Sequence, residues 1–296
     1  MARIIAVSSQ VASGHVGLSA MVPVLQALGH DVIALPTVLL SNHPGHAHVS
    51  GVRIAPEALD AMVQALDDNG WLENVAAVVS GYLPSPDHVA VVARLLDRAV
   101  TNADVAGGTG CRYVCDPVLG DQPKGLYIDR AAALALKDLL LPRAHEITPN
   151  AFELGWLAGF DIATVDDATH AASVLGRPWT TLTSLPDAAH DRLLALRMMR
   201  SPSRDCIVVT EQSSVPRRDQ VPHGTGDAFA AALVGLQAQV RPPDRPLACV
   251  MRLLSTLVDA SVGRPELALT EHLPSLATLS DRTSRLSTKP QHGDAE

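Results

Sequence analysis

The sequence predicts a single α/β domain with a mostly parallel central sheet and helices on both faces. Short apolar runs alternate with longer segments of helical spacing over most of the chain, and this alternation is typical of a parallel sheet covered by helices. Hydrophobic residues make up 47% of the sequence but aromatic residues only 3%, so the apolar mass is mostly Ala, Val and Leu, which suits helices packed on buried parallel strands. A length of 296 residues is compatible with one domain of this class.

The individual elements follow from apolar spacing and from the residues that interrupt it. Residues 3–8 form an apolar run that predicts the first strand, and helical spacing over 18–28, which stops before Gly29, predicts the first helix. The run AAVVS at 76–80 predicts a buried strand. We expect further strands at 31–40, 112–116, 145–148, 179–184, 191–198 and 206–211, a hairpin piece at 49–54, and helices at 58–66, 87–100, 130–141, 151–158, 166–175, 228–239 and 247–262.

Composition limits the extent and the setting of this domain. It is expected to span residues 1–278, because residues 279–296 are polar and predict a disordered tail. A net charge of −8 argues against a general nucleic-acid binder, which needs a basic surface. No apolar run approaches the roughly 18 residues of a membrane-spanning helix, and the apolar N-terminal run is too short for a signal peptide. The four cysteines lack CxxC spacing and are expected to be reduced thiols of a cytoplasmic protein.

The tetrapeptide Gly224-Thr225-Gly226-Asp227 is the most informative motif, and a helical segment follows it directly. Two glycines allow a sharp turn that brings backbone N–H groups close to a ligand. The helix start adds unpaired N–H groups and the positive end of the helix dipole, which bind anions. Asp227 would then lie beside a held phosphoryl group and could accept the proton of an attacking hydroxyl. For this motif alone, the alternative is an ordinary glycine turn with Asp227 as a helix cap.

Two further turns place polar side chains at predicted strand ends. The segment DPVLGD carries Asp116 and Asp121, and the segment TPNAFE carries Asn150 and Glu153. Ligands of open α/β sheets bind beyond the carboxyl ends of the strands, and carboxylates there suit a hydrated Mg²⁺ ion. The alternative for the second turn is a capping pair, with Asn150 as N-cap and Glu153 at the third helical position. Together with the glycine turn, the two segments predict a phosphate and Mg²⁺ site at one edge of the sheet.

Two other motifs could indicate a metal site or a phosphate-binding loop. His43, His46 and His48 offer imidazoles, which are common metal ligands, but no cysteine or carboxylate stands near them in the sequence. The run Gly107-Gly108-Thr109-Gly110 looks like a phosphate-binding loop, yet it precedes a predicted strand rather than a helix. We therefore expect no metal site at the histidines and a flexible loop at the glycines.

The three turns, in this order, resemble the vitamin-kinase branch of the ribokinase superfamily. The N-terminal third narrows the resemblance to pyridoxal kinases through SSQVASGHVGLSA at 8–20, LPTVLLSNH at 35–43 and SGY at 80–82. The likeness extends from about residue 4 to residue 265. It implies a ribokinase-like fold, a homodimer, and ATP-dependent phosphorylation of the 5′-hydroxymethyl group of pyridoxal, with pyridoxine and pyridoxamine as further candidate substrates. Mg²⁺ is the implied cofactor, with a monovalent cation such as K⁺ as a further candidate.

The resemblance also assigns roles to individual residues. Ser9 matches a serine that bonds the pyridine ring, Val16 a residue that packs on it, His43 a residue of the segment that closes over it, and Tyr82 a tyrosine of its pocket. Asp227 matches the base that acts on the substrate hydroxyl. The remaining matches concern the nucleotide. Gly224, Thr225 and Gly226 match the anion hole, and Thr183 and Ser184, at the end of a later strand, match residues that contact ATP. The residues matched around the phosphates are Asp116, Asp121, Tyr127, Thr148, Asn150 and Glu153, of which Asp116, Glu153 and Tyr127 lie on the metal side.

The sequence departs from the family pattern at several positions. Pro44 stands where several relatives have threonine, and Leu40 where some have a phenylalanine over the ring. Both changes affect the ring pocket. Residues 213–221 cover the adenine-side lid and do not align with the family, and Arg217 and Arg218 within them either reach the phosphates or remain solvated at the surface.

Other functions compete with this hypothesis. A hydroxymethylpyrimidine kinase shares the three phosphate-side turns, but the SSQV and SNH segments favour pyridoxal. A sugar kinase is disfavoured because the N-terminal third lacks a Gly-Gly pattern. A non-catalytic carrier or regulator that binds pyridoxal phosphate is the alternative outside the enzymes. The presence of Asp227, Asp116 and Glu153 argues against it.

Overall fold

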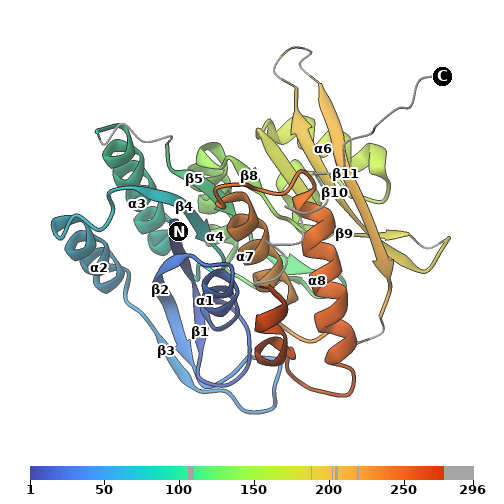
Figure 1. Cartoon of the computed structure of the whole chain (residues 1–296), viewed down its shortest axis with the longest axis horizontal. Coiled ribbons are helices and arrows are strands. Elements are labelled where there is room, and N and C mark those ends of the chain that lie inside the picture. The colour runs from blue at the N-terminus through green and yellow to red at the C-terminus, as the bar shows by residue number, and fades with distance from the viewer. Residues whose placement is uncertain (106–109, 188, 202, 204–205, 219, 277–296) are drawn as a thin grey trace, which may run out of the picture.

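A nine-stranded sheet runs through the computed structural model of the chain (Figure 1), which describes residues 1–105, 110–187, 189–201, 203, 206–218 and 220–276. The strand order is β11-β10-β9-β8-β5-β4-β1-β2-β3. All neighbours from β2 to β9 pair in parallel, whereas β3, β10 and β11 pair antiparallel at the two edges. The strands are β1 (Arg3–Val11), β2 (Asp31–Leu40), β3 (Gly51–Arg53), β4 (Val75–Ser80), β5 (Arg112–Cys115), β8 (Glu146–Ile147), β9 (Trp179–Asp187), β10 (Arg192–Arg200) and β11 (Ile207–Pro216).

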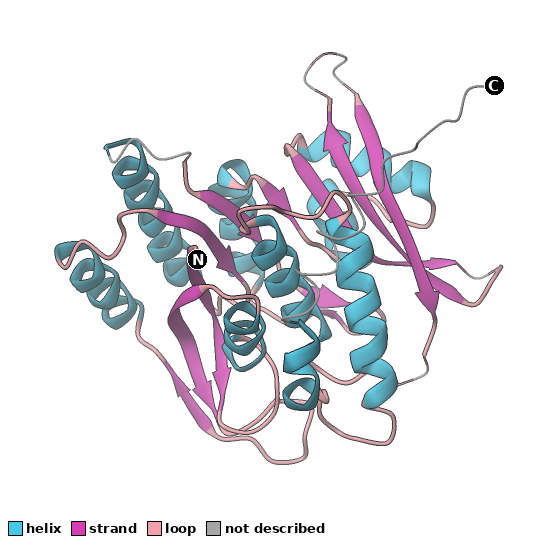
Figure 2. Cartoon of the chain, viewed as in Figure 1, coloured by secondary structure: helices cyan, strands magenta, loops and turns pink. Residues whose placement is uncertain are grey.

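Helices cover both faces of this sheet, as Figure 2 shows. Ile4 and Ala6 of β1 are buried in one hydrophobic cluster, and Ile5 and Val7 are buried in the other. Because successive side chains of a strand point to opposite faces, the two clusters lie on the two faces of the sheet. One cluster is covered by α1 (Leu18–Ala27), α7 (Thr225–Gln237) and α8 (Pro246–Ala260), and the other by α2 (Pro56–Asp68), α3 (Pro86–Val105), α4 (Arg130–Ala135), α5 (Ala151–Ala158) and α6 (Val165–Leu175).

This architecture confirms the predicted mostly parallel α/β fold, with four local differences. The segment 130–141 is helical but not one α-helix, because α4 passes into a π-helical turn over Leu136–Leu140 and a 3₁₀ turn over Leu141–Arg143. Strand β11 extends to Pro216, so the first part of the presumed lid 213–221 is paired with β10. Strand β9 extends to Asp187. A two-stranded hairpin of β6 (Gly120–Asp121) and β7 (Gly125–Leu126) was not predicted.

Two predictions concern residues outside the described ranges. The tail at 279–296 and all but the last residue of the Gly107–Gly110 run are not described. Among the described residues, no helix is both long and apolar enough to cross a membrane. All four cysteines are unpaired, with Cys111, Cys115 and Cys249 buried and Cys206 exposed.

A buried polar network fixes the C-terminal end of α7, the helix that begins with the glycine motif. Gln237 Nε2 donates to Glu146 Oε2 at 2.8 Å, and Arg197 Nε donates to Glu146 Oε1 at 3.0 Å. The Arg197 guanidinium also lies 3.8 Å from the centre of the Trp179 ring. Because a buried carboxylate needs such partners, this network connects α7 with β8, β9 and β10.

Candidate active site

The glycine motif adopts a conformation that only glycine accommodates easily. Gly224 is the N-cap of α7 with φ of 93°, and a Cβ atom there would lie 1.7 Å from the carbonyl oxygen of His15. The turn is therefore pressed against the loop between β1 and α1. A Cβ at Gly226 would meet no atom within 4 Å, so there is open space in front of the first helical turn. The first turn of α7, whose N–H groups have no partners within the helix, therefore faces open space at Gly226.

Asp227 is held at the junction of the two loops. It follows Gly226 in the first turn of α7, and its carboxylate lies close to the backbone N–H of Gly17 and to its own N–H. Burial raises the pKa of Asp227 to about 6, although these two N–H groups lower it. The carboxylate is therefore ionised at neutral pH, and its pKa lies close enough to neutral pH for it to accept and release a proton, as a general base requires.

A second group of carboxylates lies near Asp227. Asp116 directly follows β5 and is buried, and Thr148 Oγ1 donates to its Oδ1 at 3.2 Å. Burial raises the pKa of Asp116 well above its usual range, and the negative charges of Glu153 and Asp227 raise it further. These charge effects indicate that Asp116, Glu153 and Asp227, one from each predicted turn, lie near one another.

Glu153 has the capping role that was considered for it, and its role at a metal stays a prediction. It forms a capping box with Asn150: Glu153 N donates to Asn150 Oδ1 at 2.9 Å, and Asn150 N donates to Glu153 Oε2 at 3.0 Å. Its Oε1 atom also accepts the N–H of Leu119 at 2.8 Å. Asn150 Nδ2 donates to Gly120 O at 2.8 Å. The capping pair thus fastens α5 to the turn after β5, and burial raises the pKa of Glu153 to about 7.

The residues on the phosphate side fit a hydrated divalent cation rather than a closed metal cage. Buried carboxylates that repel one another gain from a cation, and Asp121 has a buried Oδ1 atom without a hydrogen-bond partner in the described structure. Within the described ranges, no three His, Cys, Asp or Glu side chains form a ready metal-binding group. Mg²⁺ is usually bound through one or two carboxylates, waters and substrate phosphates, so this donor set suits Mg²⁺ that arrives with a nucleotide.

Two other predicted phosphate-side residues, Tyr127 and Thr183, have contacts in this region. Tyr127 is 50% exposed, and its N–H donates to Leu119 O at 3.0 Å. Its pKa is raised above its usual value by burial of the hydroxyl and by Glu153 and Asp116. Thr183 donates its N–H to Pro149 O at 3.0 Å, so it adjoins the turn that carries Asn150. The expectation that Thr183 and Ser184 end a strand was wrong, because β9 continues through both.

On the predicted ring side, three segments meet. A Cβ at Gly17 would lie 2.1 Å from the Ser9 carbonyl oxygen, so the loop after β1 folds tightly back on Ser9. Tyr82 is fixed through its backbone, since its N–H donates to Ser8 Oγ at 3.1 Å and its carbonyl accepts from Thr37 Oγ1 at 2.8 Å. Val16 is buried.

The connection between β2 and β3, residues 41–50, lies over the glycine turn, and we call it the flap. The His43 ring stacks on His223 with the ring centres 3.6 Å apart. His43 Nδ1 accepts the N–H of Gly45 at 3.0 Å, so a neutral His43 carries its proton on Nε2. Burial and the nearby His223 and His46 lower the pKa of His43 to about 4. The flap therefore offers a neutral imidazole.

Sequence reasoning missed His223 and left the arginines of the lid undecided. His223 directly precedes the glycine motif, and this position is the only signal that could have indicated it. Arg218 pairs with Asp259 of α8, with Nε and Oδ1 at 3.1 Å. This pairing favours a surface role for Arg218.

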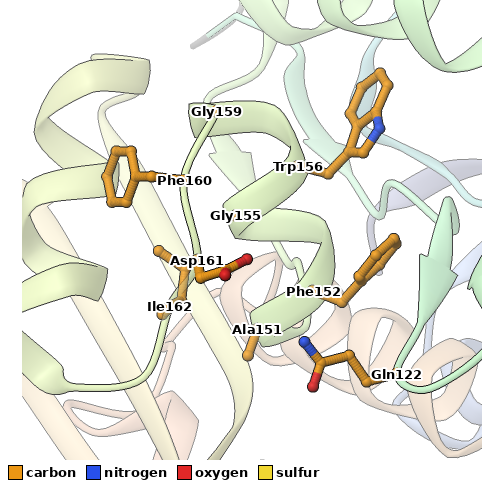
Figure 3. A pocket seen from close by; sticks show the side chains of 9 residues that line it. All are labelled: Gln122, Ala151, Phe152, Gly155, Trp156, Gly159, Phe160, Asp161 and Ile162. Atoms are coloured by element: carbon orange, nitrogen blue, oxygen red, sulfur yellow. The ribbon is translucent and has the colours of Figure 1, made fainter.

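A cavity of about 300 Å³ lies beside α5, as Figure 3 shows. Its lining includes none of the predicted site residues. A Cβ at Gly120 would lie 2.7 Å from Phe152 Cε1, so the β6–β7 hairpin packs close to this part of α5. The lining residues are Gln122, Ala151, Phe152, Gly155, Trp156, Gly159, Phe160, Asp161 and Ile162.

Comparisons with known proteins find relatives over most of the chain. The model of the phosphomethylpyrimidine kinase family matches residues 12–248. The chain is 34% identical over 236 residues to a pyridoxine/pyridoxal/pyridoxamine kinase of Bordetella avium, covering 78% of this chain and 75% of that protein. It is 30% identical over 278 residues to a pyridoxal kinase of Leifsonia xyli subsp. xyli, covering 91% and 93%.

A solved structure shows that the similarity includes the fold. The pyridoxal kinase of Leishmania donovani, in complex with ADP and pyridoxine, superposes with a TM-score of 0.87 at 29% identity and covers 93% of this chain and 94% of that chain. Sequence, family and fold agree: the chain belongs to the pyridoxal/pyridoxine kinases of the phosphomethylpyrimidine kinase family, which have a ribokinase-like fold.

Proposed function

We propose that this chain transfers the γ-phosphoryl group of ATP to the 5′-hydroxymethyl group of pyridoxal, pyridoxine and pyridoxamine. The observation that carries the proposal is the position of Asp227 at the start of α7, close to the Gly17 N–H of the ring-side loop and near enough to Asp116 to raise the pKa of that carboxyl. A base in this position would lie between the two proposed substrates. The relatives, which are named as kinases of the same vitamers, support the proposal.

Each group of site residues has its own role in the proposed reaction. Asp227 accepts the proton of the attacking hydroxyl, because its ionised carboxylate lies beside the anion-binding turn. The N–H groups of Gly224, Thr225 and Gly226 stabilise the transferred phosphoryl group. Asp116, Glu153 and Tyr127 would hold Mg²⁺, and Asp121, Thr148, Asn150, Thr183 and Ser184 would orient the nucleotide. Mg²⁺ would neutralise the charge that develops on the phosphate oxygens. K⁺ is a further candidate cation, without an assigned ligand.

Ser9, Val16, His43 and Tyr82 form the proposed ring pocket. Ser9 supplies a hydroxyl beside Gly17, Val16 an apolar contact, and His43 a neutral ring. We further propose that the chain acts in the cytoplasm as a homodimer, as the family resemblance implies; light scattering at micromolar concentration checks the oligomer.

An assay of ADP release with ATP and Mg²⁺ tests the function. It compares pyridoxal, pyridoxine, pyridoxamine and hydroxymethylpyrimidine as acceptors. We expect turnover with the B6 vitamers and at least about a hundredfold lower kcat/KM with hydroxymethylpyrimidine, since such a ratio corresponds to about 2.7 kcal/mol of transition-state binding. A preference for hydroxymethylpyrimidine would support the thiamine-pathway alternative. Binding of pyridoxal phosphate without any turnover would support a carrier or regulator.

A further inference from the structure

Glu266, which the proposed mechanism does not use, contacts three segments around the active site. Its Oε1 atom is 2.9 Å from His46 Nε2 of the flap. Its backbone forms an isolated parallel bridge with His223, which directly precedes the glycine turn. A Cβ at Gly14, in the loop after β1, would lie 2.4 Å from Glu266 Oε2. Through its side chain and its backbone, this one residue adjoins the flap, the ring-side loop and the residue that precedes the glycine turn.

The flap has few other attachments to the rest of the molecule. Its first residue is bonded to the ring-side loop, since Ser13 N donates to Ser41 O at 2.9 Å, and its middle is held by the stack of His43 on His223. The outer part of the flap includes the exposed residues Pro44, Gly45 and His48. The contact from His46 to Glu266 is the polar side-chain contact that ties this part to the C-terminal segment after α8.

The histidines of the flap are better explained by this contact than by a metal. In the part of the chain that the structure describes, no group of three His, Cys, Asp or Glu side chains is arranged to hold a metal ion. His43 is turned toward His223 and Gly45, whereas His46 is turned toward Glu266. The two histidines therefore make two separate attachments.

We propose that Glu266 is a positioning residue that, through His46, latches the flap over the ring pocket and so keeps His43 in place against the bound vitamer. The proposal rests on the proposed function for the identity of the ring substrate. The latch itself rests on contacts within the chain. If the flap is open part of the time, only the closed fraction of the molecules binds the ring tightly. The apparent affinity for the ring is then the affinity of the closed form multiplied by that fraction.

Kinetics of matched variants test the latch. Glu266→Ala and His46→Ala should each raise KM for pyridoxal about tenfold, a size typical of a partly buried hydrogen bond to a charged group. Both should change kcat and KM for ATP less than about twofold, because the phosphate side is untouched. The double variant should be no worse than either single variant, since each removes the same contact.

Two variants serve as controls. Glu271→Ala removes an exposed carboxylate on the same C-terminal segment that pairs with Arg264, and His48→Ala removes an exposed imidazole of the flap. Neither should alter KM for pyridoxal by more than about twofold. If Glu266→Ala and Glu271→Ala raise KM equally, or if the effects of Glu266→Ala and His46→Ala multiply in the double variant, the latch is wrong.

Hydrogen exchange separates the latch from the proposed function. In the ligand-free protein, Glu266→Ala should speed amide exchange of residues 41–50 about tenfold and leave α5 unchanged. This result is expected whatever the chain phosphorylates. Unchanged exchange in the flap would overturn the latch even if pyridoxal is the substrate, whereas faster exchange in a protein inactive on pyridoxal would overturn only the substrate assignment.

Discussion

The phosphate side and the ring side of the site are held together in different ways. On the phosphate side, Asp116 and Glu153 are buried, and Glu153 is fixed by backbone N–H groups of its own helix start and of the turn after β5. On the ring side, His43 and His46 are partly exposed and are held by side chains about 180 and 220 residues away in the sequence. Rigid local turns thus position the chemistry, and long-range contacts between loops position the ring.

The comparison predicts that substitutions on the phosphate side reduce activity more than substitutions on the ring side. The largest effect is expected at Asp227, where both sides meet. Asp227→Asn should lower kcat by a factor of about 10² or more and leave nucleotide binding nearly intact, because an amide cannot accept the proton. Asp166→Asn removes a first-turn carboxylate of α6 and should have no effect. Equal turnover of Asp227→Asn and the parent enzyme would show that another group is the base.

The pH dependence of kcat/KM of the parent enzyme should follow the ionisation of Asp227. The pKa of Asp227 is raised to about 6 by burial, and the base must be ionised to accept a proton. As the pH falls through about 6, kcat/KM should therefore fall, approaching a tenfold loss per pH unit. The residual activity of Asp227→Asn should lack this acid limb; an unchanged limb would assign the titration to another group.

The next effect concerns Mg²⁺. Asp116→Ala and Glu153→Ala should each raise the Mg²⁺ concentration at half-maximal rate about tenfold or more and leave pyridoxal affinity largely unchanged. Glu153→Ala also removes a capping box, which typically costs about 1 kcal/mol of stability. Asp167→Ala is the matched control, because it removes the capping box of α6 and should lower only stability. A collapse of pyridoxal affinity at unchanged Mg²⁺ dependence would place Asp116 and Glu153 on the wrong side of the site.

The same contrast explains what the sequence could predict. The ends of β5 and β8, the capping pair of Asn150 and Glu153, and the glycine turn are local, and each was predicted from a few neighbouring residues. The stack of His43 on His223 and the contact from His46 to Glu266 depend on the fold and have no local pattern. The β6–β7 hairpin was missed because its two strands have only two residues each. The extension of β11 was missed because SSVP lacks an apolar run.

The smallest effect is expected at Pro44, on the ring side. The His46 N–H donates to His43 O at 3.1 Å, so Pro44 occupies the second position of a β-turn, where its fixed φ is favourable. Threonine would loosen this turn at a cost of about 0.4–1 kcal/mol. Its hydroxyl could return a hydrogen bond to the ring, with a net gain of about 0.5–1.5 kcal/mol. The two effects oppose each other, so Pro44→Thr should change the dissociation constant of pyridoxal, measured by calorimetry, less than about tenfold in either direction. The latch from His46 to Glu266 limits the change further, because it holds the turn whichever residue stands at position 44. A gain of about a hundredfold or more would mean that the ring pocket of the parent enzyme is shaped for a molecule other than pyridoxal.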